Sequence, residues 1–235
     1  MLGKADLIPN LRTPSLSILL RPYCSGDCIP TAALFRETVH AVNAHDYTFE
    51  QREAWAPAER DLVTWNRSLL EHCALVAVLC EAPPVGSPCA EPGLRESERA
   101  KPSCVESAHI EPSCDGPGPV GETIVGFGDI DLTTGYLDRL YVHKDYQRRG
   151  VATALCDALE RAYFDSCIAA PRVQGDIPDP DVPVEAPRSI TTHASITARP
   201  FFERRGYLVV RKQHAARRVI LLTNYLMEKP FPCGR

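Results

Sequence analysis

A basic turn, Gln147–Ala152 (QRRGVA), is the segment of this sequence best suited to binding an anion. It follows an apolar strand pattern and precedes apolar residues at helical spacing, which predicts a strand-to-helix turn. The first backbone N–H groups of a helix lack intrahelical partners, and the helix dipole adds partial positive charge there. Gly150 would let an anion approach the main chain beside Arg148 and Arg149. This pattern predicts a pyrophosphate cradle, although two arginines can also be only a solvated helix start.

Composition limits the classes of function. The 235 residues are enough for one well-buried domain with large insertions. The net charge of −4 provides no global positive field for nucleic acid or for an anionic membrane surface. The basic run Arg204–Arg218 crosses a predicted strand pair, so we interpret it as solvated strand faces. The apolar runs are too short to span a bilayer. We therefore expect neither a nucleic-acid partner nor a membrane anchor.

The cysteines and the N-terminus favour a cytoplasmic protein. Residues 1–14 are followed by only a short apolar run, which is typical of a flexible leader rather than of a signal peptide. The chain has ten cysteines but no CxxC pair, so we expect reduced thiols and no metal.

Two stretches lack any hydrophobic period and are rich in proline. These are Glu81–Gly121 and the segment 166–188, which contains Pro171–Pro187. Such compositions cannot bury enough apolar surface to offset their ordering entropy, so both stretches predict disordered insertions. The first carries Cys89, Cys104 and Cys114, which are either incidental thiols or a metal clamp. We expect one domain over residues 15–230 and a short tail at 231–235.

The remaining sequence alternates strand and helix patterns. Strands are predicted at Leu16–Leu20, Ala74–Cys80, Thr123–Ile130, Gly135–Val142, Ser189–Ile196, Tyr207–Gln213 and Arg218–Met227. Helices are predicted from Asp27, as the N-cap, to Val42, and at Thr48–Trp55, Asp61–Glu71, Gly150–Phe164 and Pro200–Arg205. Thr48 with Gln51 forms a capping-box pattern. The order predicts an α/β fold, a mixed sheet with helices on both faces.

At this point the chain resembles the GNAT superfamily of acyl-CoA-dependent N-acetyltransferases. The resemblance rests on the central QRRGVA motif, on the strand LDRLYVHKDYQ before it, and on the segment Ala194–Tyr207 with its glycine-aromatic step. HDYTFEQREAWAP together with ITARPFFERRGY is similar to a branch of small acetyltransferases of bacterial type. The resemblance implies a GNAT-type, mostly antiparallel sheet and acetyl-CoA as the co-substrate.

The resemblance also implies a set of cofactor contacts. The backbone from Arg148 to Ala152 would hold the coenzyme A pyrophosphate. Main-chain groups around Leu140 and Val142 would meet the pantetheine arm, and Ser195 stands where relatives often carry an asparagine for that arm. The full predicted set is Leu140, Tyr141, Val142, Gln147, Arg148, Arg149, Gly150, Val151, Ala152, Ser195, Phe201 and Phe202.

One position departs from the family pattern. Many relatives carry a tyrosine at the position of Phe202 to protonate the leaving thiolate, and phenylalanine cannot do this. A thiol with a pKa near 8.5 can leave unassisted, so activity does not require that acid.

The period of two predicts that Tyr136, Asp138, Leu140 and Val142 share one strand face. Asp138, helped by Tyr136, could deprotonate the acceptor ammonium, or Asp138 could be a structural carboxylate paired with Arg139. His193 is the alternative base, although a lone histidine in a strand is often a core residue.

The first helices would form the acceptor site, with His45, Tyr47 and Trp55 as its wall, or with those aromatics only packing. We expect an N-acetyltransferase, a monomer or a homodimer, that acetylates a primary amine of a small molecule by direct attack. The alternatives are a catalytically silent acyl-CoA-binding module and a protein-interaction subunit.

Overall fold

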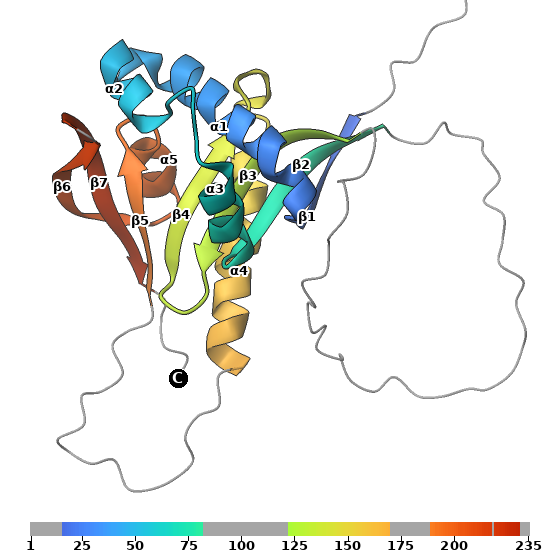
Figure 1. Cartoon of the computed structure of the whole chain (residues 1–235). Coiled ribbons are helices and arrows are strands. Elements are labelled where there is room, and N and C mark those ends of the chain that lie inside the picture. The colour runs from blue at the N-terminus through green and yellow to red at the C-terminus, as the bar shows by residue number, and fades with distance from the viewer. Residues whose placement is uncertain (1–15, 82–121, 170–188, 218, 231–235) are drawn as a thin grey trace, which may run out of the picture.

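A seven-stranded sheet forms the centre of the computed structural model, which describes residues 16–81, 122–169, 189–217 and 219–230 (Figure 1). The strands run in the order β1-β2-β3-β4-β5-β7-β6. Every neighbouring pair is antiparallel except β4 and β5, which are parallel. The strands are β1 (Leu16–Pro22), β2 (Cys73–Glu81), β3 (Thr123–Asp131), β4 (Tyr136–Val142), β5 (Ser189–Ser195), β6 (Leu208–Arg217) and β7 (Ile220–Pro230).

Helices cover both faces of this sheet (Figure 1). On one face, Phe35 and Trp65 from the helices α1 and α3 pack on Phe127 of β3. On the other face, Leu159 of α4 packs against Ile130 and Leu137. The helices are α1 (Cys28–Val42), α2 (Phe49–Trp55), α3 (Leu62–Leu70), α4 (Val151–Ala169) and α5 (Arg199–Arg204), with 3-10 turns η1 (Ser25–Asp27), η2 (Asn43–His45) and η3 (Lys144–Tyr146). The predicted fold class is confirmed.

Local sequence signals placed most helix ends correctly. The capping box at α2 is present, with the Gln51 N–H donating to Thr48 Oγ1 at 3.3 Å and the Thr48 N–H donating to Gln51 Oε1 at 3.0 Å. Helix α4 is longer than predicted and ends at Ala169, so residues 166–169 belong to the helix and not to the second insertion. The rest of that insertion, and residues 82–121 of the first, lie outside the described residues; Glu81 is the last residue of β2.

Asp27 differs from its predicted role as a helix cap. Its side chain makes no cap hydrogen bond to α1. The carboxylate instead accepts two hydrogen bonds from Arg21, at 2.7 and 2.9 Å, and one from the Cys24 N–H at 3.0 Å. Because Asp27 is almost fully buried, its charge requires a cation nearby, and Arg21 provides it. The position of Asp27 before the helix in the sequence does not predict this partner.

Glu160 links helix α4 to strand β7 and to the segment between α5 and β6. Its Oε1 accepts a hydrogen bond from the Tyr207 hydroxyl at 2.9 Å. Its Oε2 accepts from Arg205 at 2.9 Å and from Lys229 at 2.7 Å. Burial opposes the charged form of Glu160, yet the bonds from Lys229 and Arg205 outweigh it and lower the pKa. The carboxylate therefore stays ionised in the folded protein.

We expect Glu160→Gln to lower the free energy of unfolding by about 3 kcal/mol near neutral pH, because among the described residues it leaves Lys229 without a carboxylate partner and leaves Arg205 only Asp157. The contribution of Glu160 is present above its unfolded pKa of about 4.3 and is lost as the pH falls through its lower folded pKa. The difference from the wild type, measured by urea unfolding, should therefore shrink below about pH 4.

Glu203→Gln is the matched control. Glu203 pairs with Arg199 at 2.7 Å, but both side chains are 41% exposed. An exposed pair of this kind contributes about 0.5 kcal/mol or less. Equal losses for the two variants would contradict a structural role of the Glu160 network.

Candidate active site

A cavity of about 550 Å³ lies where β4 and β5 part. The two strands pair at only two positions, Tyr136 with Thr191 and Leu137 with Thr192. Beyond these pairs the parallel strands diverge and leave their facing edges open (Figure 1). The residues of β4 and β5 that line the cavity are Tyr136, Asp138, Arg139, Tyr141, His193 and Ser195.

A β-bulge at Asp138 decides which side chains of β4 face this cavity. Arg139 pairs with Asp129 and Leu137 pairs with Ile130, so Asp138 has no counterpart on β3. The bulge shifts the alternation of the strand. Tyr136, Asp138 and Tyr141 line the cavity, whereas Leu140 and Val142 pack with the residues of α4. The predicted common face of Tyr136, Asp138, Leu140 and Val142 is therefore wrong, because an unbroken period of two does not allow for the bulge.

The main chain of β4 nevertheless faces the gap at Leu140 and Val142. The His143 N–H donates to the Val125 carbonyl of β3 at 2.8 Å, so alternate residues 140 and 142 direct their polar groups away from β3. The Val142 carbonyl already accepts hydrogen bonds from Thr38 Oγ1 at 3.2 Å and from Gln147 Nε2 at 2.5 Å. Gln147 thus holds the turn in place with its side chain.

The turn after β4 has the backbone of an anion cradle. Arg148 has φ +60° and Gly150 has φ +84°, both left-handed. Such alternation turns neighbouring N–H groups toward one concave surface. Helix α4 follows with 19 residues, and the N–H groups of its first turn lack intrahelical partners. A Cβ atom added to Gly150 would meet no atom within 4 Å, so the main chain is accessible there.

Three titratable side chains, the predicted catalytic residues, meet in the cavity. The Tyr136 hydroxyl lies 3.2 Å from Nδ1 of His193, and their rings are in edge contact. Burial lowers the pKa of His193, and burial together with the nearby charge of Asp138 raises the pKa of Tyr136. Burial and the charge of Asp129 raise the pKa of Asp138 despite Arg139 at 3.3 Å. The Asp138 side chain keeps 39% exposure.

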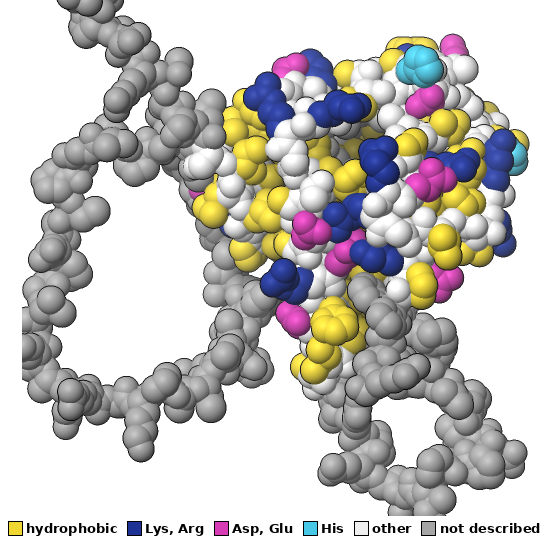
Figure 2. All heavy atoms as spheres, turned by 180° about the vertical axis from the view of Figure 1, so that it is seen from behind, with side chains coloured by type: hydrophobic (Ala, Val, Ile, Leu, Met, Phe, Trp, Pro, Cys, Tyr) yellow, Lys and Arg dark blue, Asp and Glu magenta, His cyan; other side chains and the backbone are white. Residues whose placement is uncertain are grey.

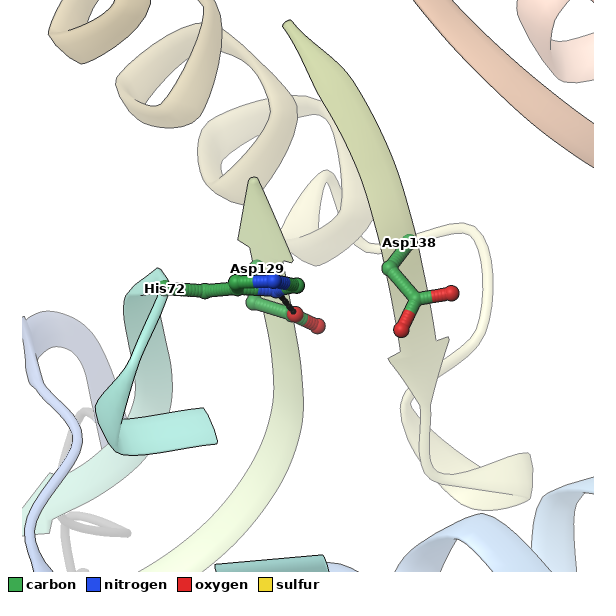
Figure 3. Close-up of side chains that lie close together, drawn as sticks. All are labelled: His72, Asp129 and Asp138. Carbon is green, nitrogen blue, oxygen red and sulfur yellow. Dashed lines mark hydrogen bonds and ion pairs between the residues drawn. The ribbon is translucent and has the colours of Figure 1, made fainter. Parts of the chain in front are cut away.

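Beside Asp138, on the neighbouring strand β3, lies a charge network that the sequence analysis missed (Figure 3). The fully buried Asp129 carboxylate accepts hydrogen bonds from His72 Nδ1 at 2.6 Å and from Arg139 at 2.8 and 2.9 Å. His72, Asp129 and Asp138 place ligand atoms within 4.8 Å of one another, as a metal site would. Because the Arg139 guanidinium already occupies both oxygens of Asp129, we interpret the cluster as an ion network. Asp129 lies inside the otherwise apolar strand pattern TIVGFGDI, and this charged residue was the signal in the sequence for such a network.

The structure places two of the three predicted acceptor residues at the cavity and the third away from it. Tyr47 and Trp55 line the cavity, with their rings in edge contact. The Tyr47 hydroxyl donates to the Thr223 carbonyl at 2.6 Å and accepts from the Ile196 N–H at 2.9 Å, so it also joins β5 to β7. His45 does not line the cavity, since its side chain is 95% exposed and contacts its neighbour Asp46.

The predicted cofactor residues of β5 and α5 also separate. Ser195 lines the cavity, and its Oγ accepts the Ala198 N–H at 3.0 Å. Phe202 is only 3% exposed and packs edge-on against Tyr207 in the core. Phe201, half-buried beside it, contacts the Phe202 ring, and neither phenylalanine lines the cavity.

The charges on one face of the molecule are mixed rather than gathered by sign. On the face in Figure 2, lysine and arginine side chains lie among aspartate and glutamate side chains. Arg205, from the basic run that the sequence analysis singled out, pairs with Asp157 at 2.6 Å and with Glu160 at 2.9 Å. Among the described helices, none is both long enough and apolar enough to cross a membrane.

Comparisons with known proteins agree with this architecture. Residues 115–209 match the family model described as "Acetyltransferase (GNAT) domain". The chain is 25% identical over 211 residues to the uncharacterized N-acetyltransferase YafP of Escherichia coli K12, covering 90% of this chain and 95% of YafP.

Two solved structures share the fold over nearly the whole chain. The GCN5-related N-acetyltransferase described as an aminotransferase, class II, from Rhodopseudomonas palustris is 26% identical with a TM-score of 0.59, covering 97% of this chain and all of that one. The PaiA N-acetyltransferase of Thermoplasma acidophilum, in complex with coenzyme A, is 14% identical with a TM-score of 0.55, covering 92% and 99%. The fold and the matched family model thus agree on one family of acetyltransferases. The chain belongs to the GNAT superfamily.

The two histidines at the site should titrate on opposite sides of the ordinary value of about 6.5. The hydrogen bond to Asp129 raises the pKa of His72, and burial lowers that of His193. We expect nuclear magnetic resonance titration to show this order, with His72→Gln and His193→Gln assigning the signals. A higher pKa for His193 than for His72 would contradict the network in Figure 3.

Proposed function

We propose that this protein transfers an acetyl group from acetyl-CoA to the primary amine of a small molecule, by direct attack in a ternary complex. The observation that carries the proposal is the juxtaposition of the left-handed turn at Arg148 and Gly150 with the gap between β4 and β5. The turn suits a pyrophosphate, and the gap leads to a cavity that holds candidate bases.

Three parts of the chain would bind successive parts of the co-substrate. The N–H groups from Arg148 to Ala152 would hold the pyrophosphate, with the side chains of Arg148 and Arg149 screening its charge. The open edge of β4 around Leu140 would pair with the amides of the pantetheine arm, as an added strand does. The Ser195 hydroxyl still has its O–H to donate while its oxygen accepts the Ala198 N–H.

The reaction requires a neutral amine. An ammonium group must first lose a proton, and we assign that proton to Asp138, which faces the cavity and has a raised pKa. The amine nitrogen then attacks the thioester carbonyl carbon, so the N–C bond forms while the C–S bond breaks, and the nitrogen releases its second proton to water to give the neutral amide. The sulfur leaves as a thiolate, which a pKa near 8.5 permits without an acid. Tyr136 would position an ordered water, and His193 is the competing base.

The acceptor would enter from the side of α2 and β7. Tyr47 and Trp55 form an aromatic wall there, which suits the face of a cation or an apolar group. A cavity of about 550 Å³ has the size of sites for small molecules.

A catalytically silent acyl-CoA-binding module is the second candidate. Phe202, where many relatives carry an acidic tyrosine, is buried in the core and offers no proton. Release of free thiol from acetyl-CoA in an amine screen separates the two: binding without thiol release with any amine would favour the silent module.

Gly150→Glu should abolish acetyl-CoA binding, measured by calorimetry, because it adds bulk and negative charge where the pyrophosphate would lie. A non-glycine residue at this positive φ costs roughly 1–2 kcal/mol of strain. Gly206→Glu is the control, since Gly206 has φ +85° and equally open surroundings. Both variants should lose similar stability, and only the first should lose binding. Retained affinity in Gly150→Glu would remove the basis of the proposed function.

Asp138→Asn should lower kcat by about 10²–10⁴ with little change in acetyl-CoA affinity. In the wild type, kcat should rise with pH as Asp138 loses its proton, and this limb should disappear in the variant. Tyr136→Phe and His193→Gln are measured beside it across pH. Near wild-type turnover in Asp138→Asn, together with a loss of turnover in His193→Gln, would instead assign the role of the base to His193 of β5.

A further inference from the structure

Arg60 lines the active-site cavity and has no acidic partner among the residues that the structure describes. It lies between α2 and α3 and is half-buried. Its guanidinium carbon lies 4.5 Å from the ring centre of Phe35 and 4.8 Å from that of Trp65. The described residues give it a single hydrogen bond, from NH2 to the Trp55 carbonyl at 3.3 Å. Two ring faces therefore fix the guanidinium while most of its five N–H donors remain available.

The other arginines of the cavity differ from Arg60. Arg139 is committed to Asp129 and also contacts Asp138 at 3.3 Å. Arg217 is exposed at the end of β6, and it donates a hydrogen bond to the neighbouring Ala216 carbonyl at 3.5 Å. Arg60 alone among the three combines partial burial, fixed orientation and unused donors. Burial without a carboxylate also lowers its pKa, which shows that its charge is poorly compensated.

A second group in the cavity also has unused hydrogen-bonding capacity. Asn224 of β7 lines the cavity, and its Oδ1 is buried with no hydrogen bond to any described residue. A buried amide oxygen of this kind costs stability until an N–H reaches it. The cavity thus offers acceptors for an ammonium or amine N–H, at Asn224 and Asp138, and a planar fork of donors at Arg60.

We propose that Arg60 binds a carboxylate of the acceptor, so that the acceptor is an amino acid or another amine bearing a carboxylate. Guanidinium groups bind carboxylates through two parallel hydrogen bonds, which adds orientation to charge attraction. A carboxylate held at Arg60 would fix the acceptor and leave its amine free to reach Asp138. This inference rests on the proposed function and adds the chemical class of its substrate.

The test compares amino acids with their carboxamides as acceptors, because each pair has nearly the same shape and differs in charge. We expect the wild type to prefer the acid by about 10- to 100-fold in kcat/KM, mainly through a lower KM. Arg60→Gln should reduce that ratio to about one. Arg217→Gln removes an equal charge from the same cavity and should keep the preference. Arg60→Lys keeps the charge without the fork and should restore the preference only in part.

A binding measurement makes the test independent of turnover. Calorimetry with N-acetyl amino acids and their carboxamides should show tighter binding of the acid to the wild type, and no difference in Arg60→Gln. Equal turnover and binding of acids and amides by the wild type would overturn the inference while leaving the acetyltransferase proposal intact. Tighter binding of aminophosphonates than of amino acids would also overturn it. If no amine consumes acetyl-CoA, the proposed function fails, and calorimetry still decides whether Arg60 binds a carboxylate.

Discussion

The parting of β4 from β5 after two residue pairs is the constraint on which the site depends. Parallel strands that stay paired would satisfy each other's backbone groups and leave no room between them. Here the sheet is continuous at one end and open at the other, so the edge of β4 keeps unpaired polar groups inside the protein. In the proposed function, the pantetheine arm of the co-substrate would pair with this open edge of β4.

Two ion networks hold the elements on either side of that opening. On one side Asp129 binds Arg139 and His72, next to the bulge of β4. On the other side Glu160 binds Arg205 and Lys229, joining α4 to β7. Buried charges of this kind are costly unless their partners are in place, so they favour one arrangement of the strands over its alternatives. The bulge and the networks together direct Asp138 into the cavity.

Different elements supply the titratable residues and the aromatic residues of the cavity. The titratable residues Tyr136, Asp138 and His193 come from the two parting strands, whereas the aromatic walls and Arg60 come from α1, α3 and the segments around α2. In the proposed function the strands bind the part of the reaction common to the family. The helical side supplies the groups that would select the acceptor, and Arg60, which has no acidic partner among the described residues, would favour an acceptor that carries a carboxylate.

Features that depend on neighbours along the chain could be predicted from the sequence: the element order, the capping box at Thr48, and the turn at Gly150 before an apolar helix. Their physics is local, since propensity, capping and periodicity act within a few residues. The bulge at Asp138, the bond of Asp129 to His72 and the isolation of Arg60 could not be predicted. Each depends on strand register or on side chains far apart in the sequence, and only the packed tertiary structure brings those together.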